Sequence, residues 1–373
     1  MPGLPIPAGP DALTPGWLTL ALREGGSPPG LTVAGFTTET VGQEYGFTGR
    51  LARLHLRYGR ADEQAPQSLV AKFPDPTAGQ RLDAERLRGR YQRFEREVLF
   101  YQQIGADAGI RVPQLYYGNV DVAAGAFVLL LEDLAPGRQG DAFAGCSPEE
   151  AGIIVERVAK FHARWWEDPD LSRFEWLPAW SAAGRDAQAR LQRSLPPFLT
   201  KYGHRVPKDI LDLIDALSSC YGRLFEELSR PPTTMVHGDL HLDNIFFDVA
   251  DAPLVVFDWQ GVGRARGAVD LRDAVFDMPH GGTDAAVERE LLRRYHDALM
   301  AHGVESYSFE ELMRDSWLAL LHRMGGYVNG YAAMDLDALT GRERQLVQAF
   351  FDEGRLFAAL RAYDVAELIG ELR

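Results

Sequence analysis

The N-terminal third of the chain alternates short apolar stretches with polar turns, a pattern typical of β-strands. Residues 31–56 predict two strands joined by a turn, and residues 68–74 predict a third strand after another polar turn. Two further apolar stretches, at 114–119 and 126–134, predict two more strands. We therefore expect a sheet in this part of the protein.

A different spacing, of three and four residues between apolar positions, predicts helices. It appears first in a charged stretch at 81–105, so we expect a long helix there with one face packed on the sheet. A capping box begins at Ser147, with Pro148 at the first helical position, and starts a helix that carries one apolar stripe. Pro207 begins another helix, and the rest of the chain is mainly helical apart from one predicted pair of strands.

This order of elements predicts an α+β protein with two lobes, a small β-rich N-lobe with one long helix and a larger helical C-lobe. We place an N-terminal extension at 1–30, the N-lobe at 31–134 and the C-lobe at 135–373. The stretch at 135–141 is rich in polar residues and glycine and is typical of a linker. Periodicity alone also fits other α+β arrangements.

The composition narrows the classes of partner and compartment. The 373 residues contain 39 Lys and Arg against 53 Asp and Glu, which gives a formal net charge of -14. Such a protein repels phosphate backbones, so we expect neither nucleic acid nor an anionic membrane as a main partner. No segment approaches 18 uninterrupted apolar residues, and the N-terminus lacks a basic region before an apolar core. We expect a cytoplasmic protein in which Cys146 and Cys220 are buried, unpaired residues.

One segment carries candidate chemistry, H-G-D-L-H-L-D-N at 237–244, followed by F-D-W at 257–259. Asp239 and Asn244 have the five-residue interval of a kinase catalytic loop, and Asp258 ends an apolar strand. Phosphoryl transfer needs a carboxylate that accepts the hydroxyl proton of the acceptor, and oxygen ligands that hold Mg²⁺ on the nucleotide phosphates. We expect the hairpin between the two motifs to bring these three side chains together.

The pattern H-G-D-x-x-x-x-N, a hydrophobic strand and F-D-W resembles the aminoglycoside phosphotransferase and choline kinase superfamily. The combination of E-V-x-F-Y, L-L-E-D-L and V-F-D-W-Q is most similar to its ecdysteroid-kinase-like branch. The resemblance implies a protein-kinase-like two-lobed fold and an ATP- and Mg²⁺-dependent transfer to a hydroxyl of a small molecule. It also implies that Asp239 is the catalytic base and that Asn244 and Asp258 are the Mg²⁺ ligands.

Residues in the predicted N-lobe fit a nucleotide site. Lys72 lies on the third predicted strand, at the place of the lysine that holds the α- and β-phosphates. Its expected partner is Glu97 on the following helix, with Glu95 as the alternative in the same turn.

Two further segments complete this nucleotide site. The turn that contains Gly46, Phe47 and Thr48 stands where a loop would cover the phosphates. It does not follow G-x-G-x-x-G, and a plain hairpin turn fits it equally well. At the end of the fifth predicted strand, we expect the adenine to bond to the backbone of Glu132 and Leu134.

The sequence after F-D-W contains no A-P-E motif, so we do not expect a protein substrate. Asp270 follows in a helix, and we expect it to hold the catalytic loop or to cap that helix. For His162, Trp165 and Trp166, core packing is favoured over an aromatic cage for a cation.

Two alternative functions fit parts of the sequence. His237, Asp239 and His241 form H-x-D-x-H, which superficially fits a metal-dependent phosphohydrolase, but no second cluster of ligands accompanies them. A non-catalytic nucleotide-binding scaffold is disfavoured because every expected catalytic side chain is present. The acceptor remains open among aminoglycoside-, choline- and sterol-like alcohols and hydroxyacyl thioesters, as does the choice between ATP and GTP.

Overall fold

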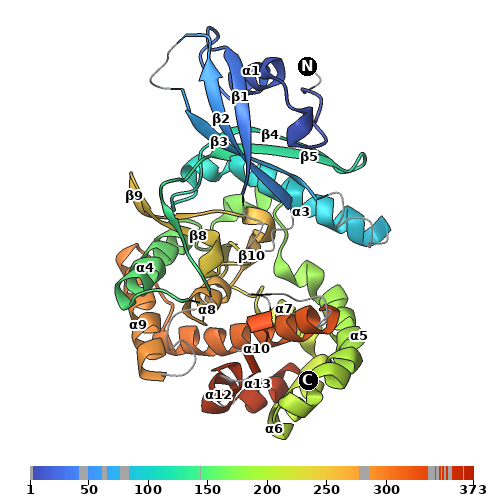
Figure 1. The fold of residues 1–373 in the computed structure, drawn as a ribbon. Coiled ribbons are helices and arrows are strands. Elements are labelled where there is room, and N and C mark those ends of the chain that lie inside the picture. The colour runs from blue at the N-terminus through green and yellow to red at the C-terminus, as the bar shows by residue number, and fades with distance from the viewer. Residues whose placement is uncertain are drawn as a thin grey trace. The chain divides into compact units, whose positions relative to one another are not determined.

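The computed structural model describes residues 3–41, 49–60, 65–75, 84–142, 144–276, 285–334, 355–363 and 365–373, together with 341, 344, 345, 347, 350 and 351. The protein forms two compact units. Figure 1 colours the polypeptide from blue at the N-terminus to red at the C-terminus. Unit 1 comprises Met1–Gln139 and Asp243–Gly261, and unit 2 comprises Gly140–Leu242 and Val262–Arg373.

Unit 1 contains a five-stranded sheet in the order β1-β2-β3-β5-β4, in which all neighbouring strands are antiparallel. The strands are β1 (Val33–Val41), β2 (Gly49–Tyr58), β3 (Ser68–Pro74), β4 (Leu115–Asp121) and β5 (Ala126–Glu132). All five strands expected from the sequence are therefore present. Short connections explain the antiparallel pairs β1–β2, β2–β3 and β4–β5, whereas β3 pairs with β5 across the connection that contains α3.

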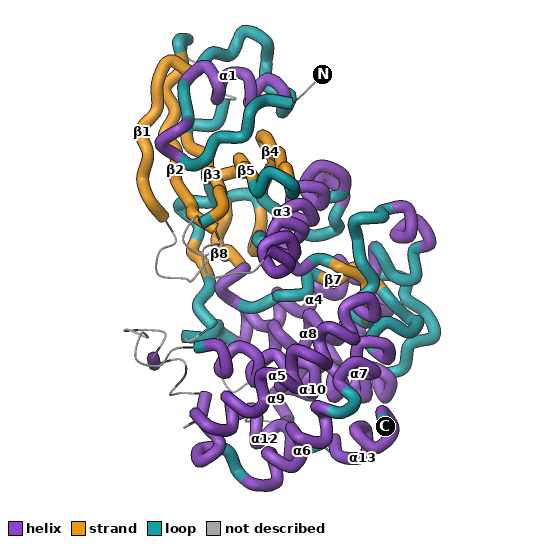
Figure 2. The backbone as a smooth tube through the Cα atoms, turned by 90° about the vertical axis from the view of Figure 1, so that its right-hand side faces the viewer, coloured by secondary structure: helices purple, strands orange, loops and turns teal. Residues whose placement is uncertain are grey.

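Alternation along β3 sends its side chains to two different environments. Leu69, Ala71 and Phe73 are fully buried in a cluster that includes the apolar face of α1 (Pro15–Glu24), whose N-terminus is capped by Thr14. Lys72 points to the opposite face, where α3 (Ala84–Gln103) packs. In Figure 2, β4 and β5 lie between α1 and α3.

Unit 1 also contains a three-stranded sheet in the order β6-β8-β9, formed by β6 (Arg138–Gln139), β8 (Ile245–Val249) and β9 (Ala252–Val256). The prediction of a plain linker at 135–141 is wrong at β6, which pairs with β8. The Arg138 guanidinium lies 4.8 Å from the centre of the Phe247 ring, a cation–π contact. A strand of two residues is too short to show alternation in the sequence.

Unit 2 is helical. Its α-helices are α4 (Pro148–Arg164), α5 (Gly184–Tyr202), α6 (Lys208–Ser218), α7 (Tyr221–Glu227), α8 (Ala268–Phe276), α9 (Ala285–Ala301), α10 (Phe309–Ala333), α12 (Arg355–Ala362) and α13 (Val365–Leu372). The predicted capping box at Ser147 is present. The helix expected from Pro207 onward breaks in two, because the hydroxyls of Ser218 and Ser219 donate to backbone carbonyls of the last turn of α6.

Unit 2 also contains a pair of strands, which flank the candidate motifs in the sequence. β7 (Thr234–Val236) pairs antiparallel with β10 (Gly263–Ala265), and β7 leads directly into His237. Cys146 and Cys220 are both buried, as expected. None of the helices in the described ranges has the length and apolar character needed to cross a membrane.

Candidate active site

Three charged side chains from distant parts of the sequence meet in unit 1. The Nζ of Lys72 donates to both carboxylate oxygens of Glu97, at 2.9 and 2.8 Å, and to Oδ1 of Asp258 at 2.9 Å. Lys72 is 4% exposed and Glu97 is 1% exposed, so this ion pair is buried. Of the two glutamates considered from the sequence, the structure brings Glu97 to Lys72, while Glu95 is only half-buried.

Burial and mutual charge set the protonation of this cluster. Although burial alone lowers the pKa of Lys72, the carboxylates of Asp258 and Glu97 raise it above its ordinary value. Burial raises the pKa of Glu97 to about 7, even though Lys72 acts in the opposite direction. The cluster therefore holds a firmly protonated lysine beside a glutamate that takes up a proton near neutral pH.

Asp258 is held in an uncommon backbone conformation. Its φ of +63° lies in the left-handed region, which is unfavourable for most residues with a side chain but is visited by aspartate. Directly after it, the Trp259 ring stacks on Phe100 of α3, with the ring centres 4.0 Å apart and the planes at 12°. The amide of Gln260 donates to Asp258 Oδ1 at 2.7 Å. Strained residues of this kind are frequent at active sites.

Asn244 lies at the start of the β8–β9 hairpin, next to the segment that leads to Asp258. Its backbone carbonyl accepts the N–H of Phe257 at 3.1 Å, and its side chain is buried. An amide oxygen and a carboxylate are the hard oxygen donors that Mg²⁺ prefers. The chemistry of this donor set, at the two ends of one hairpin, therefore fits a magnesium ion.

Asp239 lies in unit 2, five residues before Asn244 in the sequence, and its backbone neighbours are anchored by Asp270. The Asp270 carboxylate, fully buried in the first turn of α8, accepts the N–H groups of His237 at 2.6 Å and Gly238 at 2.8 Å. The side chain of Asp239 is 66% exposed, so it is open to a reactant. We expected Asp270 either to hold the catalytic loop or to cap its helix, and these contacts match the first role.

Behind Asp270 lies a contact that the sequence analysis missed. His162 Nε2 lies 3.2 Å from Asp270 Oδ2, and His162 Nδ1 lies 2.7 Å from the hydroxyl of Tyr295. A carboxylate can only accept, so Nε2 carries the hydrogen, and in the neutral ring Nδ1 accepts the Tyr295 O–H. A Cβ on Gly267 would lie 2.6 Å from the Tyr295 hydroxyl, so only glycine fits beside this bond. In the sequence, the only indication of this contact was that His162 lies on the apolar face of α4.

The predicted hinge at the end of β5 has most of its polar groups engaged. The Glu132 carboxylate accepts from Arg111 at 2.8 Å and from the N–H of Gln114 at 2.9 Å. The Glu132 N–H donates to the C=O of Gln114, and the Leu134 C=O accepts the N–H of Gly137. The Glu132 N–H and the Leu134 C=O are therefore already engaged within unit 1.

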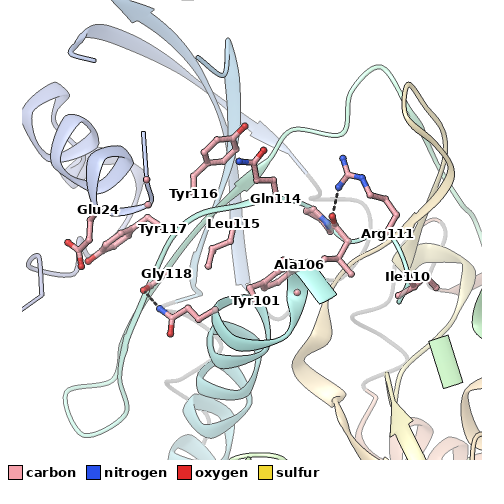
Figure 3. Close-up of a pocket in the computed structure, with 16 residues that line it drawn as sticks. Glu24, Tyr101, Ala106, Ile110, Arg111, Gln114, Leu115, Tyr116, Tyr117 and Gly118 are labelled. Atoms are coloured by element: carbon pink, nitrogen blue, oxygen red, sulfur yellow. Dashed lines mark hydrogen bonds between the residues drawn. The ribbon is translucent and has the colours of Figure 1, made fainter. Parts of the chain in front are cut away.

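The predicted residues of the phosphate-covering turn, Gly46, Phe47 and Thr48, lie outside the described residues. Another feature of unit 1 is a cavity of about 770 Å³ along β4 and the end of α3, shown in Figure 3. Tyr101, Leu115 and Tyr116 contribute to its lining. Of the described residues predicted for the nucleotide site, none lines this cavity, although its lining residues Arg111 and Gln114 both donate to the Glu132 carboxylate.

The metal-ligand motif considered from the sequence does not form a metal cluster in the described part of the protein. His237 is fully buried and its Nδ1 accepts the N–H of Asp239 at 3.3 Å. His241 Nε2 lies 3.7 Å from Asp239 Oδ1. Over the described ranges, no three His, Cys, Asp or Glu side chains gather so that they could share a metal ion.

Comparison with known proteins adds to this geometry. Solved structures with the same fold include the GDP complex of a wild-type aminoglycoside 2'-phosphotransferase, with 13% identity, a TM-score of 0.53 and coverage of 92% of this chain and 99% of the other. A choline kinase from Cryptosporidium parvum matches with 10% identity, a TM-score of 0.55 and coverage of 95% and 96%. An ethanolamine kinase from Plasmodium vivax matches with 11% identity, a TM-score of 0.52 and coverage of 90% and 85%. The expected kinase-like fold is thereby confirmed.

No curated protein matches the sequence. The ecdysteroid-kinase-like branch stays a prediction, because these matches do not distinguish between branches. The model of the phosphotransferase enzyme family matches residues 54–307, which is more than half of the sequence. With that match, the resemblance expected from the H-G-D and F-D-W motifs is confirmed, and the chain belongs to the phosphotransferase enzyme family.

Proposed function

We propose that this protein transfers the γ-phosphoryl group of ATP to a hydroxyl group of a small molecule. The observation that carries the proposal is the cluster of Lys72, Glu97 and Asp258, in which one buried cation meets two carboxylates from separate segments. This is the set of side chains that a kinase needs beside the nucleotide phosphates. Membership of the phosphotransferase family supports the same reaction.

Asp239 is the proposed general base. Its exposed carboxylate would accept the proton of the acceptor hydroxyl while that oxygen bonds to the γ-phosphorus and the bond to the leaving ADP breaks. The Asp270 contacts fix the backbone just before Asp239 and thereby limit how far its carboxylate can move. Such positioning lowers the entropy cost of bringing base and acceptor together.

Asn244 and Asp258 are the proposed Mg²⁺ ligands, and Lys72 is the proposed donor to the α- and β-phosphates. When bound, Mg²⁺ would neutralise the charge that builds up on the phosphoryl oxygens. Because the pKa of Lys72 is raised, the lysine carries its proton at any physiological pH. Glu97 holds the ammonium in place from the side of α3.

The purine is proposed to bond to the backbone of Glu132 and Leu134, and the turn at Gly46, Phe47 and Thr48 to cover the phosphates. Backbone groups of this kind accept either purine after a small shift. The aminoglycoside phosphotransferase in the comparison was solved with GDP. GTP is therefore tested beside ATP as the donor.

The acceptor is proposed to be an aminoglycoside-, choline- or sterol-like alcohol, in keeping with the aminoglycoside and choline substrates in the names of the related structures. The net charge of -14 favours a cationic acceptor through long-range attraction. A panel of amino alcohols, aminoglycosides and sterol-like alcohols, assayed for consumption of ATP and of GTP, tests the proposal.

Asp239→Asn supplies the sharper test. Loss of a general base typically lowers turnover by about two to four orders of magnitude, while ATP affinity should change little because Asp239 contacts the acceptor. Asp243→Asn, in the same loop, is the matched control and should keep most of the activity. Turnover is measured on the best acceptor of the panel, and affinity by nucleotide-induced thermal stabilisation. Near-normal turnover in Asp239→Asn would remove Asp239 from the proposed role.

A further inference from the structure

Gln260 occupies a position that the proposed reaction does not yet use. It follows Asp258 by two residues, is buried, and its Nε2 donates to Asp258 Oδ1 at 2.7 Å. Lys72 donates to the same oxygen at 2.9 Å. The orientation of the amide is fixed by chemistry, because a carboxylate accepts hydrogen bonds and would repel the amide oxygen.

Two donors on one carboxylate oxygen restrict the carboxylate more than either donor alone. Rotation about the last bond of the Asp258 side chain would break at least one of the two hydrogen bonds. Lys72 is shared with Glu97 and is the proposed partner of the phosphates, so it can change partners when a nucleotide binds. The Gln260 amide has no such competing role in the proposed reaction.

The backbone that carries Gln260 is itself anchored. The indole of Trp259 is fully buried and stacks on Phe100, and its Nε1 donates to the C=O of Val256 at 3.1 Å. This fixes the segment after Asp258 against both α3 and the end of β9. Packed elements of unit 1 therefore hold the Gln260 amide within hydrogen-bond distance of Asp258.

From these contacts we infer that Gln260 is a positioning residue that holds the Asp258 carboxylate in the orientation required by the metal ion. The inference rests on the proposed function, in which Asp258 is a Mg²⁺ ligand. Partners behind a metal ligand typically change metal affinity by about 10- to 100-fold when they are removed. Gln260 acts on the metal through Asp258.

The test uses the full-length protein with ADP, so that no acceptor has to be known. Thermal stabilisation by ADP is measured without metal and then over a titration of MgCl₂. Gln260→Met keeps the length of the side chain but removes the donor, and Gln260→Asn keeps an amide that is one methylene too short to reach. For both variants we expect an unchanged response to ADP alone and an Mg²⁺ midpoint raised by about tenfold.

A titration of CaCl₂ separates positioning from general damage. Mg²⁺ demands near-ideal octahedral geometry, whereas Ca²⁺ accepts irregular coordination, so the Ca²⁺ midpoint should shift much less than the Mg²⁺ midpoint. Gln102→Met is the matched control, because it removes a comparable amide bond, to the Gly118 C=O at 3.0 Å, on the opposite flank of α3. This control should leave both midpoints unchanged.

An Mg²⁺ midpoint within about twofold of wild type in both Gln260 variants would overturn the inference, as would equal shifts for Mg²⁺ and Ca²⁺. Failure of the proposed function looks different. In that case wild type itself shows no metal-dependent stabilisation by ADP, and the role of Gln260 falls together with that of Asp258.

Discussion

Unit 1 and unit 2 each bury a polar network, and the two networks differ in how their charges are balanced. In unit 1, one cation meets the two carboxylates of Glu97 and Asp258, and the Asp258 side chain remains 15% exposed. In unit 2, the single carboxylate of Asp270 meets two backbone N–H groups and the His162 imidazole, and Asp270 and His162 are fully buried. Only the first of these two networks includes a cation and has an opening to solvent, whereas in the second the carboxylate is held by neutral donors and is sealed from water.

The difference separates the tasks of the two networks. A fully satisfied and buried network makes one arrangement rigid, as the Asp270 contacts do for the loop before Asp239. A network of carboxylates that opens to solvent can take up a cation such as Mg²⁺ and can exchange partners when phosphates arrive. Changes in the Asp270 network should therefore appear mainly as lost stability, and changes in the Lys72 cluster mainly as altered responses to pH, metal and nucleotide.

Asp270→Asn should have the largest effect on stability. The amide cannot accept from two backbone N–H groups and from His162 at once, so the free energy of unfolding should fall by about 3 kcal/mol or more. Turnover should also be lost, because the backbone before Asp239 is released. Urea denaturation followed by circular dichroism measures the stability.

Asp209→Asn is the control for Asp270→Asn. Asp209 pairs with Arg361 on the surface, and removing an exposed ion pair changes stability little. Equal losses of unfolding free energy in the two variants would show that the Asp270 network stabilises the fold no more than a surface ion pair does. The comparison between the units would then fail.

Tyr295→Phe should have an intermediate effect. It removes the O–H that donates to His162 Nδ1 and leaves a buried nitrogen without its donor, at a cost of about 1–3 kcal/mol. The KM for the nucleotide should not change, because the nucleotide is proposed to bind to unit 1. A changed nucleotide KM with unaltered stability would contradict the division of tasks.

Glu97→Gln should change how stability depends on pH. The pKa of Glu97 is about 7 in the folded protein against an ordinary value of 4.5, so the folded state holds a proton that the unfolded state has released. Between these two pH values, the stability of wild type therefore falls as pH rises. Glu97→Gln removes this contribution and should flatten the dependence.

Thermal denaturation of wild type and Glu97→Gln between pH 4.5 and 8 measures this slope. Glu95→Gln, in the same turn of α3, serves as the control and should keep the wild-type slope. If Glu97→Gln keeps it as well, then Glu97 does not titrate in this window.

Local patterns in the sequence were sufficient to predict the sheet of unit 1 and α3. The meeting of Lys72 and Glu97 was expected from a kinase-like order, with a lysine on the third strand and a glutamate on the next helix, and it left Glu95 as an alternative. The network around His162 could not be found this way. Its partners Asp270 and Tyr295 lie 108 and 133 residues away, and no periodicity links such distant positions.

Other features were missed for equally physical reasons. β6 has two residues and shows no alternation, and the break between α6 and α7 depends on serine hydroxyls that compete for carbonyls. The contact of Gln260 with Asp258 is local, but glutamine after a strand gives no signal of its own. The motif V-F-D-W-Q marked the position without indicating its role.

Because the polypeptide passes between the two units more than once, unit 1 is not encoded by one continuous stretch of the gene. The polypeptide enters unit 2 at Gly140, returns to unit 1 at Asp243 and leaves it again at Val262. A gene fragment that ends at Gln139 would encode Lys72 and Glu97 but neither Asn244 nor Asp258. A single recombination at this point therefore does not transfer all of unit 1, because its two segments are separated by Gly140–Leu242.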